Sequence, residues 1–411
     1  MDPKLSPAIQ ELGRRGVIMP APHTVYVDDA VLPERIAPGV VLFPGTRLMG
    51  DTISIGPNSE VGSETPMTLI DCQLGHGVSV KGGYANGCVF LDGAEMGSGA
   101  HLRPGTVLEE EAGGAHSVGL KQTVLLSYVV AGSLINFCDC LMAGGTSRKN
   151  HSEVGSSYIH FNFTPHGDKA TPSLIGDVPR GVLLDQPPIF LGGQGGLVGP
   201  VQIEYGVTVA AGSILRKDAL EPNCLYQAAG AKDSKPRAYA RGHYRSIERL
   251  VHHNLSYIGN IRALQAWYQQ VRIRTMRTDS FREACRQGAL TQLDAIVKER
   301  IKRLQQVTEK LPQAIESWTA ALGAEASQEP VGLRFQREWV RRWPRIQEHL
   351  IAPPPDAVGE EARDRFLSAW NQLEKTSHTA AVNQLSAEAK KAATKWLTAI
   401  VQHAASLESP Q

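Results

Sequence analysis

Leu191-GGQGG, Leu197-VGPVQ, Ile203-EYGVT, Val209-AAGSI and Leu215-RKDAL follow one another without a break, and each group of six residues begins with an aliphatic residue. An amphipathic helix places its apolar residues three and four apart, so a period of six excludes it. A simple array of hairpins is also excluded, because turn-forming residues arrive too often. The period suits short strands that each point one aliphatic side chain inward and then turn a corner, where glycine tolerates the unusual backbone angles.

The same period extends toward the N-terminus in further blocks that begin at Ile36, Ile55, Met96 and Val118, each in its own frame. Three hexads make one coil, ladder hydrogen bonds join neighbouring coils, and the stacked aliphatic side chains form a continuous core. We therefore predict a mainly β fold: a single-stranded left-handed parallel β-helix over residues 24–223, preceded by an N-terminal extension of residues 1–23.

The pattern changes after this region, where residues 224–241 read as a linker and residues 242–411 as an α-helical domain. Apolar residues recur at threes and fours from Ile247 to Val271, which indicates a long amphipathic helix. Ser280-Phe-Arg-Glu283 is typical of a capping box that opens a second helix, and Pro312 is expected to kink or end that helix. Further helices are expected at residues 359–375 and 386–406. No catalytic motif occurs there, so packing, oligomerisation or docking is the expected role.

Charge and composition restrict the possible partners only weakly. The chain has 42 Lys plus Arg against 41 Asp plus Glu, but residues 237–311 hold 15 basic against 6 acidic residues. This stretch is either a solvated helix face in a bundle or a surface that attracts a partner, whether nucleic acid, membrane phosphates or another protein. We expect a cytoplasmic protein, because the N-terminus lacks a signal-peptide pattern, no segment is long and apolar enough to span a membrane, and six cysteines in so long a chain suggest buried thiols. Cys138-Asp-Cys140 is interpreted as core filling, and no metal site is predicted.

The motifs between Gly99 and Asp218 carry a resemblance to a known family. They are the stretches Ala100-HLRPG-Thr106, Gly119-Leu-Lys121, Lys149-NHSEV-Gly155, Phe161-Asn-Phe163 followed by Lys169, Ile189–Val201 and Val209–Ser213. In order and spacing they resemble the acetyltransferase half of the bifunctional glucosamine-1-phosphate acetyltransferase and N-acetylglucosamine-1-phosphate uridyltransferase family. The stretch Met142–His151 is also similar to one in little-characterised bacterial proteins described as sugar-nucleotide pyrophosphorylase-like.

The resemblance implies roles for individual residues. His151 corresponds to the catalytic base, which suits the ordinary pKa of histidine. The other assignments concern binding: the sugar or sugar phosphate by Arg103, Lys121, Asn150, His160 and Lys169, and acetyl-CoA or another acyl-CoA, the expected co-substrate, by Asn162, Phe163, Gly193 and Ala211. The family also implies a homotrimer with the active site between adjacent subunits.

The chain departs from the family pattern at several places, and some readings stay open. About one coil is added between Lys121 and His151, and about one is missing between His151 and Asn162. Gly193 replaces a serine of the family and Phe163 a tyrosine, so the identity of the substrate does not carry over. His160 is equally well read as a hydrogen-bonded core histidine.

Three functions follow from these observations. The first is an acyl-CoA-dependent acyltransferase that acts on an amino sugar or sugar phosphate. The second is a sugar-1-phosphate nucleotidyltransferase-like protein, suggested by the glycine-rich Gly45-Thr-Arg-Leu-Met49, although that segment falls in hexad register and only about 23 residues precede the β-helix. The third is a non-catalytic β-helix that binds a sugar nucleotide or serves as a scaffold.

Overall fold

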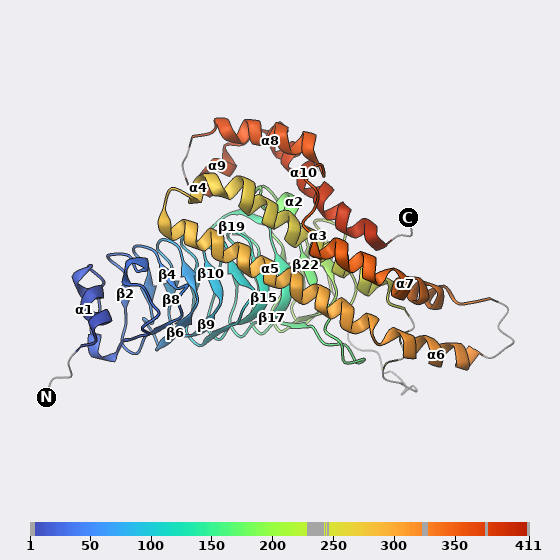
Figure 1. The fold of residues 1–411 in the computed structure, drawn as a ribbon, viewed down its shortest axis with the longest axis horizontal. Helices are drawn as coiled ribbons and strands as arrows, with labels where there is room; N and C mark the ends of the chain where they lie inside the picture. The colour runs from blue at the N-terminus through green and yellow to red at the C-terminus, as the bar shows by residue number, and fades with distance from the viewer. Residues whose placement is uncertain are drawn as a thin grey trace.

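The computed structural model describes residues 5–227, 242, 244, 246–322, 328–374 and 377–408. The N-terminal part of the chain winds into a parallel β-helix of about 11 turns, and a helical region follows it (Figure 1). The predicted fold class is therefore confirmed. Most of the predicted linker, residues 228–241, lies outside the described residues, and the division of the chain into domains stays a prediction.

The turns of the β-helix contribute short strands to three sides, and the strands of neighbouring coils pair in parallel. Side one consists of β1 (Tyr26–Val27), β3 (Arg47–Met49), β6 (Met67–Ile70), β9 (Gly83–Asn86), β12 (Ala100–Leu102), the first halves of β15 (Gly119–Leu125) and β17 (Asn136–Met142), β21 (Ile159–Phe161), β24 (Gly196–Val198) and β27 (Ile214–Leu215). Side two consists of β4 (Ser54–Ile55), β7 (Gln73–Leu74), β10 (Cys88–Phe90), β13 (Thr106–Leu108), the second halves of β15 and β17, β22 (Ser173–Ile175) and β25 (Gln202–Ile203). Side three consists of β2 (Val41–Leu42), β5 (Glu60–Val61), β8 (Ser79–Val80), β11 (Glu95–Met96), β14 (Gly113–Gly114), β16 (Val130–Ala131), β20 (Glu153–Val154), β23 (Phe190–Leu191), β26 (Thr208–Val209) and β28 (Leu225–Tyr226).

The core of the β-helix is the stack of side chains that point inward from successive coils. On side one, Leu102 pairs with Leu120, and Leu120 with Phe137. All three are fully or almost fully buried. Each inward position thus contacts its equivalent one coil away, which is the packing that the hexads predict.

Two strands run through the corner between side one and side two without interruption. β15 turns this corner at Gln122 and β17 turns it at Asp139, with φ values of 50° and 63°. Positive φ is uncommon for residues other than glycine, and the preceding coil has Gly105 at the equivalent corner. Lys121 and Cys138, the residues directly before the corners of β15 and β17, lie side by side at the end of side one.

The helical region begins with a long interrupted helix. Its elements are α3 (Glu248–Trp267), the π-helical turn η3 (Tyr268–Arg272), α4 (Ile273–Met276), α5 (Ser280–Thr308), α6 (Leu311–Leu322), α7 (Val331–Ile351), α8 (Glu360–Gln372), α9 (His378–Asn383), α10 (Ala387–Ala405) and the short η4 (Ser406–Glu408). Within the β-helix lie α2 (Val178–Gly181) and the 3₁₀ turns η1 (Pro22–Thr24) and η2 (Pro33–Arg35), and the small antiparallel hairpin is formed by β18 (Gly145–Ser147) and β19 (Asn150–His151).

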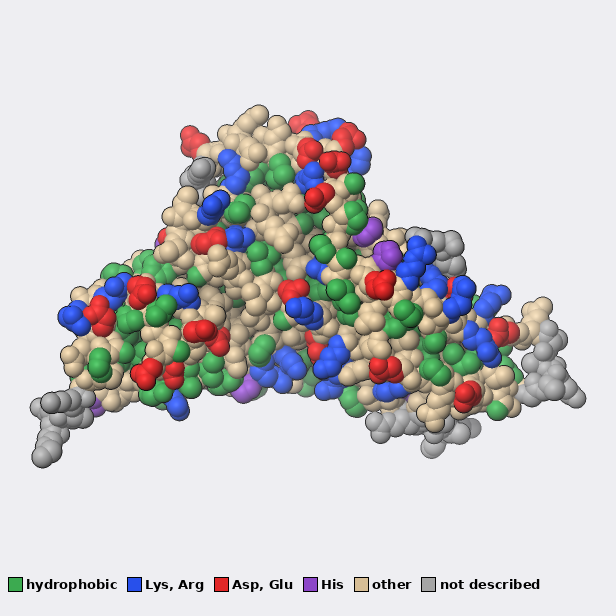
Figure 2. Space-filling view, viewed as in Figure 1, with side chains coloured by type: hydrophobic (Ala, Val, Ile, Leu, Met, Phe, Trp, Pro, Cys, Tyr) green, Lys and Arg blue, Asp and Glu red, His purple; other side chains and the backbone are tan. Residues whose placement is uncertain are grey.

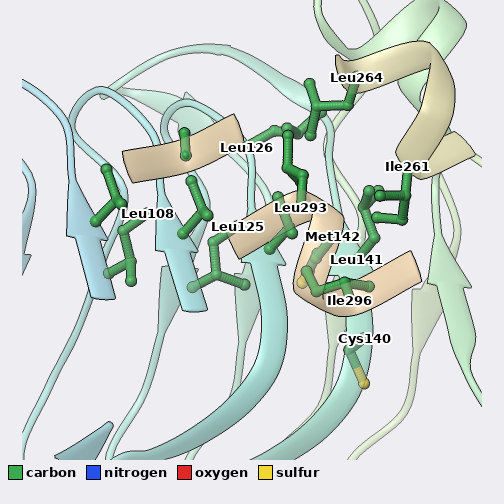
Figure 3. Close-up of a cluster of buried hydrophobic side chains, with 14 of the residues drawn as sticks. Leu108, Leu125, Leu126, Cys140, Leu141, Met142, Ile261, Leu264, Leu293 and Ile296 are labelled. Carbon is green, nitrogen blue, oxygen red and sulfur yellow. The ribbon is translucent and has the colours of Figure 1, made fainter. Parts of the chain in front are cut away.

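The helices cover side two. α5 lies along β4, β7, β10 and β13, and α3 contacts β22. Figure 3 shows the interface, where Leu125 and Leu126 of the β-helix face Leu264, Leu293 and Ile296 of the helices. All five side chains are buried, so the β-helix and the helical region share one hydrophobic core.

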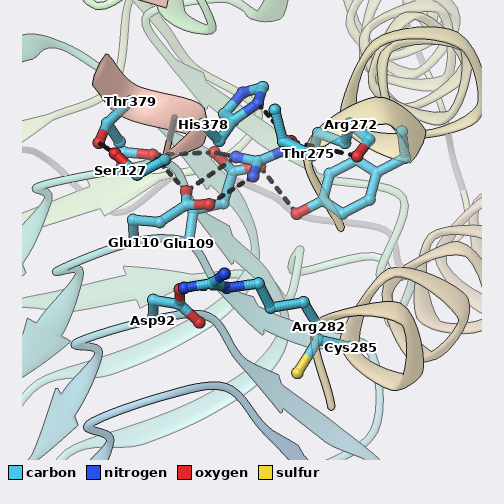
Figure 4. A network of polar contacts seen from close by, with 12 residues as sticks. Asp92, Glu109, Glu110, Ser127, Arg272, Thr275, Arg282, Cys285, His378 and Thr379 are labelled. Atoms are coloured by element: carbon cyan, nitrogen blue, oxygen red, sulfur yellow. Dashed lines mark hydrogen bonds and ion pairs between the residues drawn. The ribbon is translucent and has the colours of Figure 1, made fainter. Parts of the chain in front are cut away.

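Buried ion pairs also join the two regions. The Arg272 guanidinium of η3 lies 2.9 Å from a carboxylate oxygen of Glu109 and 2.6 Å from one of Glu110, and Tyr268 donates to Glu109 at 2.9 Å (Figure 4). Arg300 of α5 pairs with Asp139 at 2.7 Å. Both arginines belong to the basic stretch 237–311, so part of its charge is neutralised inside the molecule.

Two details of the helical region differ from the sequence expectations. The N-cap of α5 is Asp279, whose carboxylate accepts hydrogen bonds from the backbone N–H groups of Phe281 and Arg282. The predicted capping box with Ser280 as N-cap is therefore displaced by one residue. α7 lies within the predicted α-helical domain, but no individual helix is predicted there; its sequence is rich in arginine and contains Pro344. Among the described residues, no helix is long and apolar enough to cross a membrane.

A short helix lies at the N-terminal end of the β-helix (Figure 1). This helix, α1 (Pro7–Arg14), is capped by Ser6 and buries Ile9 and Leu12. The chain after it joins the first coil, since Ile18 forms a parallel bridge with Val41. The predicted N-terminal extension is thus packed against the β-helix in its described part.

Candidate functional site

A basic cluster lies at the corner between side one and side two. Arg103, Lys121 and Cys138 occupy equivalent positions on successive coils. Lys121 and Cys138 directly precede the corner residues Gln122 and Asp139, whereas Pro104 separates Arg103 from Gly105. The guanidinium of Arg103 reaches over the neighbouring coil to the Cys138 thiol, with Nη2 3.6 Å from Sγ. Three coils therefore present two cations and one thiol in a row.

Lys169 joins this row from a loop. Burial and the Asp139 carboxylate raise the pKa of the Cys138 thiol, whereas Arg103, Lys121 and Lys169 act in the opposite direction. All three cations are thus close enough to influence one thiol. We call Arg103, Lys121 and Lys169 the basic cluster.

The basic cluster lacks counter-charges within the described parts of the chain. No salt bridge there joins any of its three cations to a carboxylate, and the Arg103 Nε is buried without a hydrogen-bond partner. Like charges held together repel one another unless an anion is present. The arrangement is therefore suited to hold an anion such as a phosphate, for which the arginine fork has a favourable geometry.

The loop that carries Lys169 replaces a tight corner. After Phe161 the chain leaves the β-helix and returns at Ser173, and we call residues 162–172 the site loop. Asn162 donates to Asp139 at 2.9 Å, and the Lys169 ammonium lies 5.8 Å from the centre of the Phe163 ring. Phe163 is 57 % exposed, so an aromatic surface borders the basic cluster.

His160 lies inside the β-helix rather than at the basic cluster. It is 3 % exposed, its Nδ1 lies beside the Cys138 carbonyl, and its Nε2 is 2.8 Å from the Ser173 hydroxyl. Burial lowers the pKa of His160 to about 4. This geometry fits the interpretation of His160 as a hydrogen-bonded core histidine, and its role in substrate binding stays a prediction.

His151 and Asn150 lie on the β18–β19 hairpin, which leaves the β-helix at a different corner, between side two and side three. Arg148 in this hairpin binds Glu95 of side three and the backbone carbonyl of Glu111, which lies in the turn between side two and side three. The His151 Nδ1 is 2.8 Å from the Arg148 carbonyl. Within one chain, therefore, the predicted base and the basic cluster lie at different corners.

Gly193 and Ala211 lie at the third corner, between side three and side one. A Cβ on Gly193 would come within 2.8 Å of the Ser156 carbonyl, and a Cβ on the preceding Gly192 within 2.3 Å of the Ala211 amide. At Gly192 and Gly193 the coils therefore stack too closely for any residue with a Cβ atom. The predicted acyl-CoA residues are consequently divided, with Asn162 and Phe163 at the first corner and the other two at the third.

The motifs of the resemblance do not include two residues that lie at the basic cluster, Cys138 and Arg300. Cys138 follows Lys121 by 17 residues, nearly the 18 that separate Lys121 from Arg103, so the coil spacing alone is a signal for its place in the row. Arg300 contacts Asp139 and the Lys169 carbonyl from α5, and no local pattern marks it. No group of three or more His, Cys, Asp or Glu side chains suited to a metal ion occurs among the residues described.

Comparisons with known proteins agree with the motifs. No family model matches the chain. Bifunctional protein GlmU of Thermotoga maritima is 28 % identical over 211 residues, which is 51 % of this chain and 42 % of that protein, and Bifunctional protein GlmU of Nocardia farcinica is 29 % identical over 217 residues, or 53 % and 39 %. A solved structure of the polysialic acid O-acetyltransferase OatWY covers 56 % of this chain at 16 % identity, with a TM-score of 0.17 that is too low to support an argument.

The similarity covers only part of each protein, since the chain spans about two fifths of the length of these curated relatives. The identity is below a third and extends over about half of the chain, so it supports a related β-helix region and leaves the activity of this chain to be proposed. The resemblance indicated by the motifs is thereby confirmed: over about half its length this chain is similar to Bifunctional protein GlmU.

Proposed function

We propose that the chain is an acyl-CoA-dependent acyltransferase that acts on an amino sugar or a sugar phosphate. The observation that carries the proposal is the basic cluster: Arg103 and Lys121 lie at equivalent positions of neighbouring coils, the site loop adds Lys169, and none of the three has a salt-bridge partner within the described chain. The similarity to the bifunctional relatives supports the same class of chemistry.

The basic cluster binds the phosphate of the acceptor. The Arg103 guanidinium donates two hydrogen bonds to phosphate oxygens, and the ammonium groups of Lys121 and Lys169 supply the remaining charge. Charge-assisted hydrogen bonds of this kind contribute about 1.5–3 kcal/mol each. The exposed Phe163 ring offers an apolar contact beside them.

His151 is the proposed general base. Its neutral ring accepts the proton of the acceptor amine while the amine nitrogen forms a bond to the thioester carbonyl carbon. The carbon–sulfur bond then breaks, and the sulfur leaves as the thiol after it takes up a proton. Asn162 and backbone N–H groups of neighbouring coils are suited to stabilise the negative charge that develops on the carbonyl oxygen.

The proposed chemistry requires a second copy of the chain. His151 and the basic cluster lie at different corners of one β-helix, so a neighbouring subunit brings one corner to the other. We therefore include the homotrimer, with the site between subunits, in the proposal, together with a cytoplasmic location.

A binding function without catalysis is the second candidate. The separation of His151 from the basic cluster within one chain favours it, because a β-helix that binds a sugar nucleotide through its cations needs no base. Release of thiol distinguishes the two candidates.

The test measures thiol release from acetyl-CoA in the presence of a panel of amino-sugar phosphates. Turnover that disappears in His151→Ala, with unchanged folding, supports the acyltransferase. Binding of the sugar phosphates without turnover contradicts it and favours the second candidate. Release of pyrophosphate that depends on UTP would instead identify a nucleotidyltransferase.

A further inference from the structure

Arg300 connects the helical region to the basic cluster. Its side chain projects from α5, is 1 % exposed, and lies 2.7 Å from an Asp139 carboxylate oxygen through Nη2. Its Nη1 donates to the backbone carbonyl of Lys169 at 3.2 Å. One guanidinium thus contacts both the corner residue behind Cys138 and the backbone of the residue that supplies the third cation.

Asp139 extends this contact to the other end of the site loop. Its second carboxylate oxygen accepts a hydrogen bond from the Asn162 amide at 2.9 Å. Asp139 is 4 % exposed. The first residue of the site loop and the backbone at Lys169 are therefore held by one buried Arg300–Asp139 pair.

The helical region holds the site loop at two further points. Asn254 of α3 donates to the Ala170 carbonyl at 2.8 Å, and the Tyr244 hydroxyl donates to Asp168 at 3.1 Å. Asp168 in turn accepts a hydrogen bond from Thr164 at 2.6 Å. Three residues outside the β-helix thus fix a loop that a β-helix alone leaves without support.

We infer that Arg300 is a positioning residue, which places the site loop so that Lys169 completes the basic cluster. This inference rests on the proposed function of the cluster as an anion site. A buried ion pair contributes little to stability compared with apolar residues of similar size, so its role here is the geometry that it imposes. Lysine cannot replace Arg300, because its single ammonium lacks the fork that reaches Asp139 and the Lys169 carbonyl together.

Cys138 supplies a readout that does not depend on activity. Among the cysteines, four are buried, Cys224 is exposed and Cys138 is half-buried beside the basic cluster. In a Cys224→Ser background, alkylation by iodoacetamide therefore reports on Cys138. We expect Arg300→Met to increase the alkylation rate about tenfold, because the site loop opens more readily. Arg300→Lys, which keeps the charge but not the fork, should show most of the same increase.

Arg272→Met in the same background is the matched control. Arg272 is also a buried arginine that joins the helical region to β-helix carboxylates, but its partners are Glu109 and Glu110. It should lower the melting temperature at least as much as Arg300→Met and leave the alkylation rate of Cys138 in the folded protein unchanged. Equal rates in the Arg300→Met variant and its parent, or equal increases in both arginine variants, would overturn the inference. Asp139→Asn combined with Arg300→Met removes both charges and serves as a second variant if the single variant does not fold.

Inorganic phosphate separates this inference from the proposed function. In the parent protein we expect phosphate to slow the alkylation of Cys138, and in Arg300→Met we expect that protection to weaken about tenfold. Absence of protection in the parent contradicts the anion site, while the change in alkylation rate still decides whether Arg300 positions the loop.

Discussion

Arg103 is a principal residue of the proposed anion site, because Lys121 lies at the equivalent position of the next coil and the Arg103 Nε is buried without a partner. Arg103→Met should weaken the binding of an amino-sugar phosphate about tenfold or more, since a charge-assisted hydrogen bond contributes about 1.5–3 kcal/mol. Isothermal titration calorimetry with glucosamine 1-phosphate measures the change, and raised salt should weaken binding to the parent more than to the variant.

Arg47→Met is the matched control for this prediction. Arg47 is an exposed arginine on β3 of the same side, several coils away, and it lies over the Tyr26 ring. Its replacement should leave the affinity for glucosamine 1-phosphate unchanged. Equal losses in the two variants would show that general surface charge, and not the basic cluster, attracts the ligand.

His160 makes the stability of the β-helix depend on pH. Burial lowers its pKa to about 4 from an ordinary value of 6.5, so the unfolded chain binds a proton more readily than the folded one. Between pH 6.5 and 4 the folded state therefore loses stability as the pH falls, by about 3 kcal/mol for a shift of this size. Above pH 6.5 both states are neutral at this residue, and the contribution is complete.

Urea unfolding of the parent and of His160→Gln at pH 7 and pH 4.5 measures this effect. The variant should be less stable at pH 7, because it loses the hydrogen bonds to Cys138 and Ser173. It should also lose less stability than the parent when the pH is lowered. His378, whose pKa is lowered by burial to about 3, contributes equally in both proteins and cancels in the comparison. An identical pH dependence in the two proteins would contradict the assignment to His160.

At the scale of the elements, α5 is the helix that fastens the helical region to the β-helix. Leu293 of α5 is completely buried in the shared core, so Leu293→Ala should lower the free energy of unfolding by about 2–5 kcal/mol through lost burial and a residual cavity. Val331→Ala on α7 is the control, because Val331 is 67 % exposed and surface changes usually cost less than about 0.5 kcal/mol. Denaturant unfolding measures both, and a small effect of Leu293→Ala would contradict a shared core.

The sequence predicts the β-helix well and its helical cover less well, for a physical reason. Hexads are local, so the aliphatic residues from Leu191 to Leu215 specify their own coils. The period of α3 is also visible in the sequence, but the side of the β-helix that it covers depends on pairs such as Arg272 with Glu109, 163 positions apart in the numbering. The bounds of the helix at Val331–Ile351 are not predicted, because exposed arginines dominate its sequence and Pro344 interrupts the apolar pattern of a helix.

The same difference applies to the candidate site. Arg103 and Lys121 lie one coil apart, and the motif spacing identifies both. Lys169 and Arg300 meet through a contact between residues 131 positions apart, which no spacing reveals. His151, which the resemblance assigns to catalysis, lies on a hairpin whose corner the sequence does not reveal.

At the scale of the molecule, the helices pack on side two, while side one of the described chain carries exposed apolar side chains near the basic cluster. Ile159, Phe161 and Phe163 are exposed there by 39 %, 41 % and 57 %, and exposed apolar groups of this kind are typical of contacts between proteins. We expect the proposed homotrimer to form through this surface.

Lys and Arg side chains gather elsewhere, for example over α7 in Figure 2, where Arg334, Arg337, Arg341 and Arg345 are exposed.

Light scattering tests this expectation. The parent should have a mass about three times that of the 44.5 kDa chain, whereas Phe161→Glu should shift the mass toward that of one chain because it places charge in the apolar contact. Val331→Glu, at an exposed apolar position on α7, should leave the mass unchanged. A parent protein of single-chain mass would contradict the homotrimer and the shared site with it.

The small helix at the start of the β-helix has a consequence for the behaviour of the protein in concentrated solution. A column of parallel rungs ends in a row of unpaired backbone groups, to which a rung from another molecule can add. α1 packs against that end with Ile9 and Leu12. It thereby prevents a second molecule from adding a rung there, and so prevents growth into filaments.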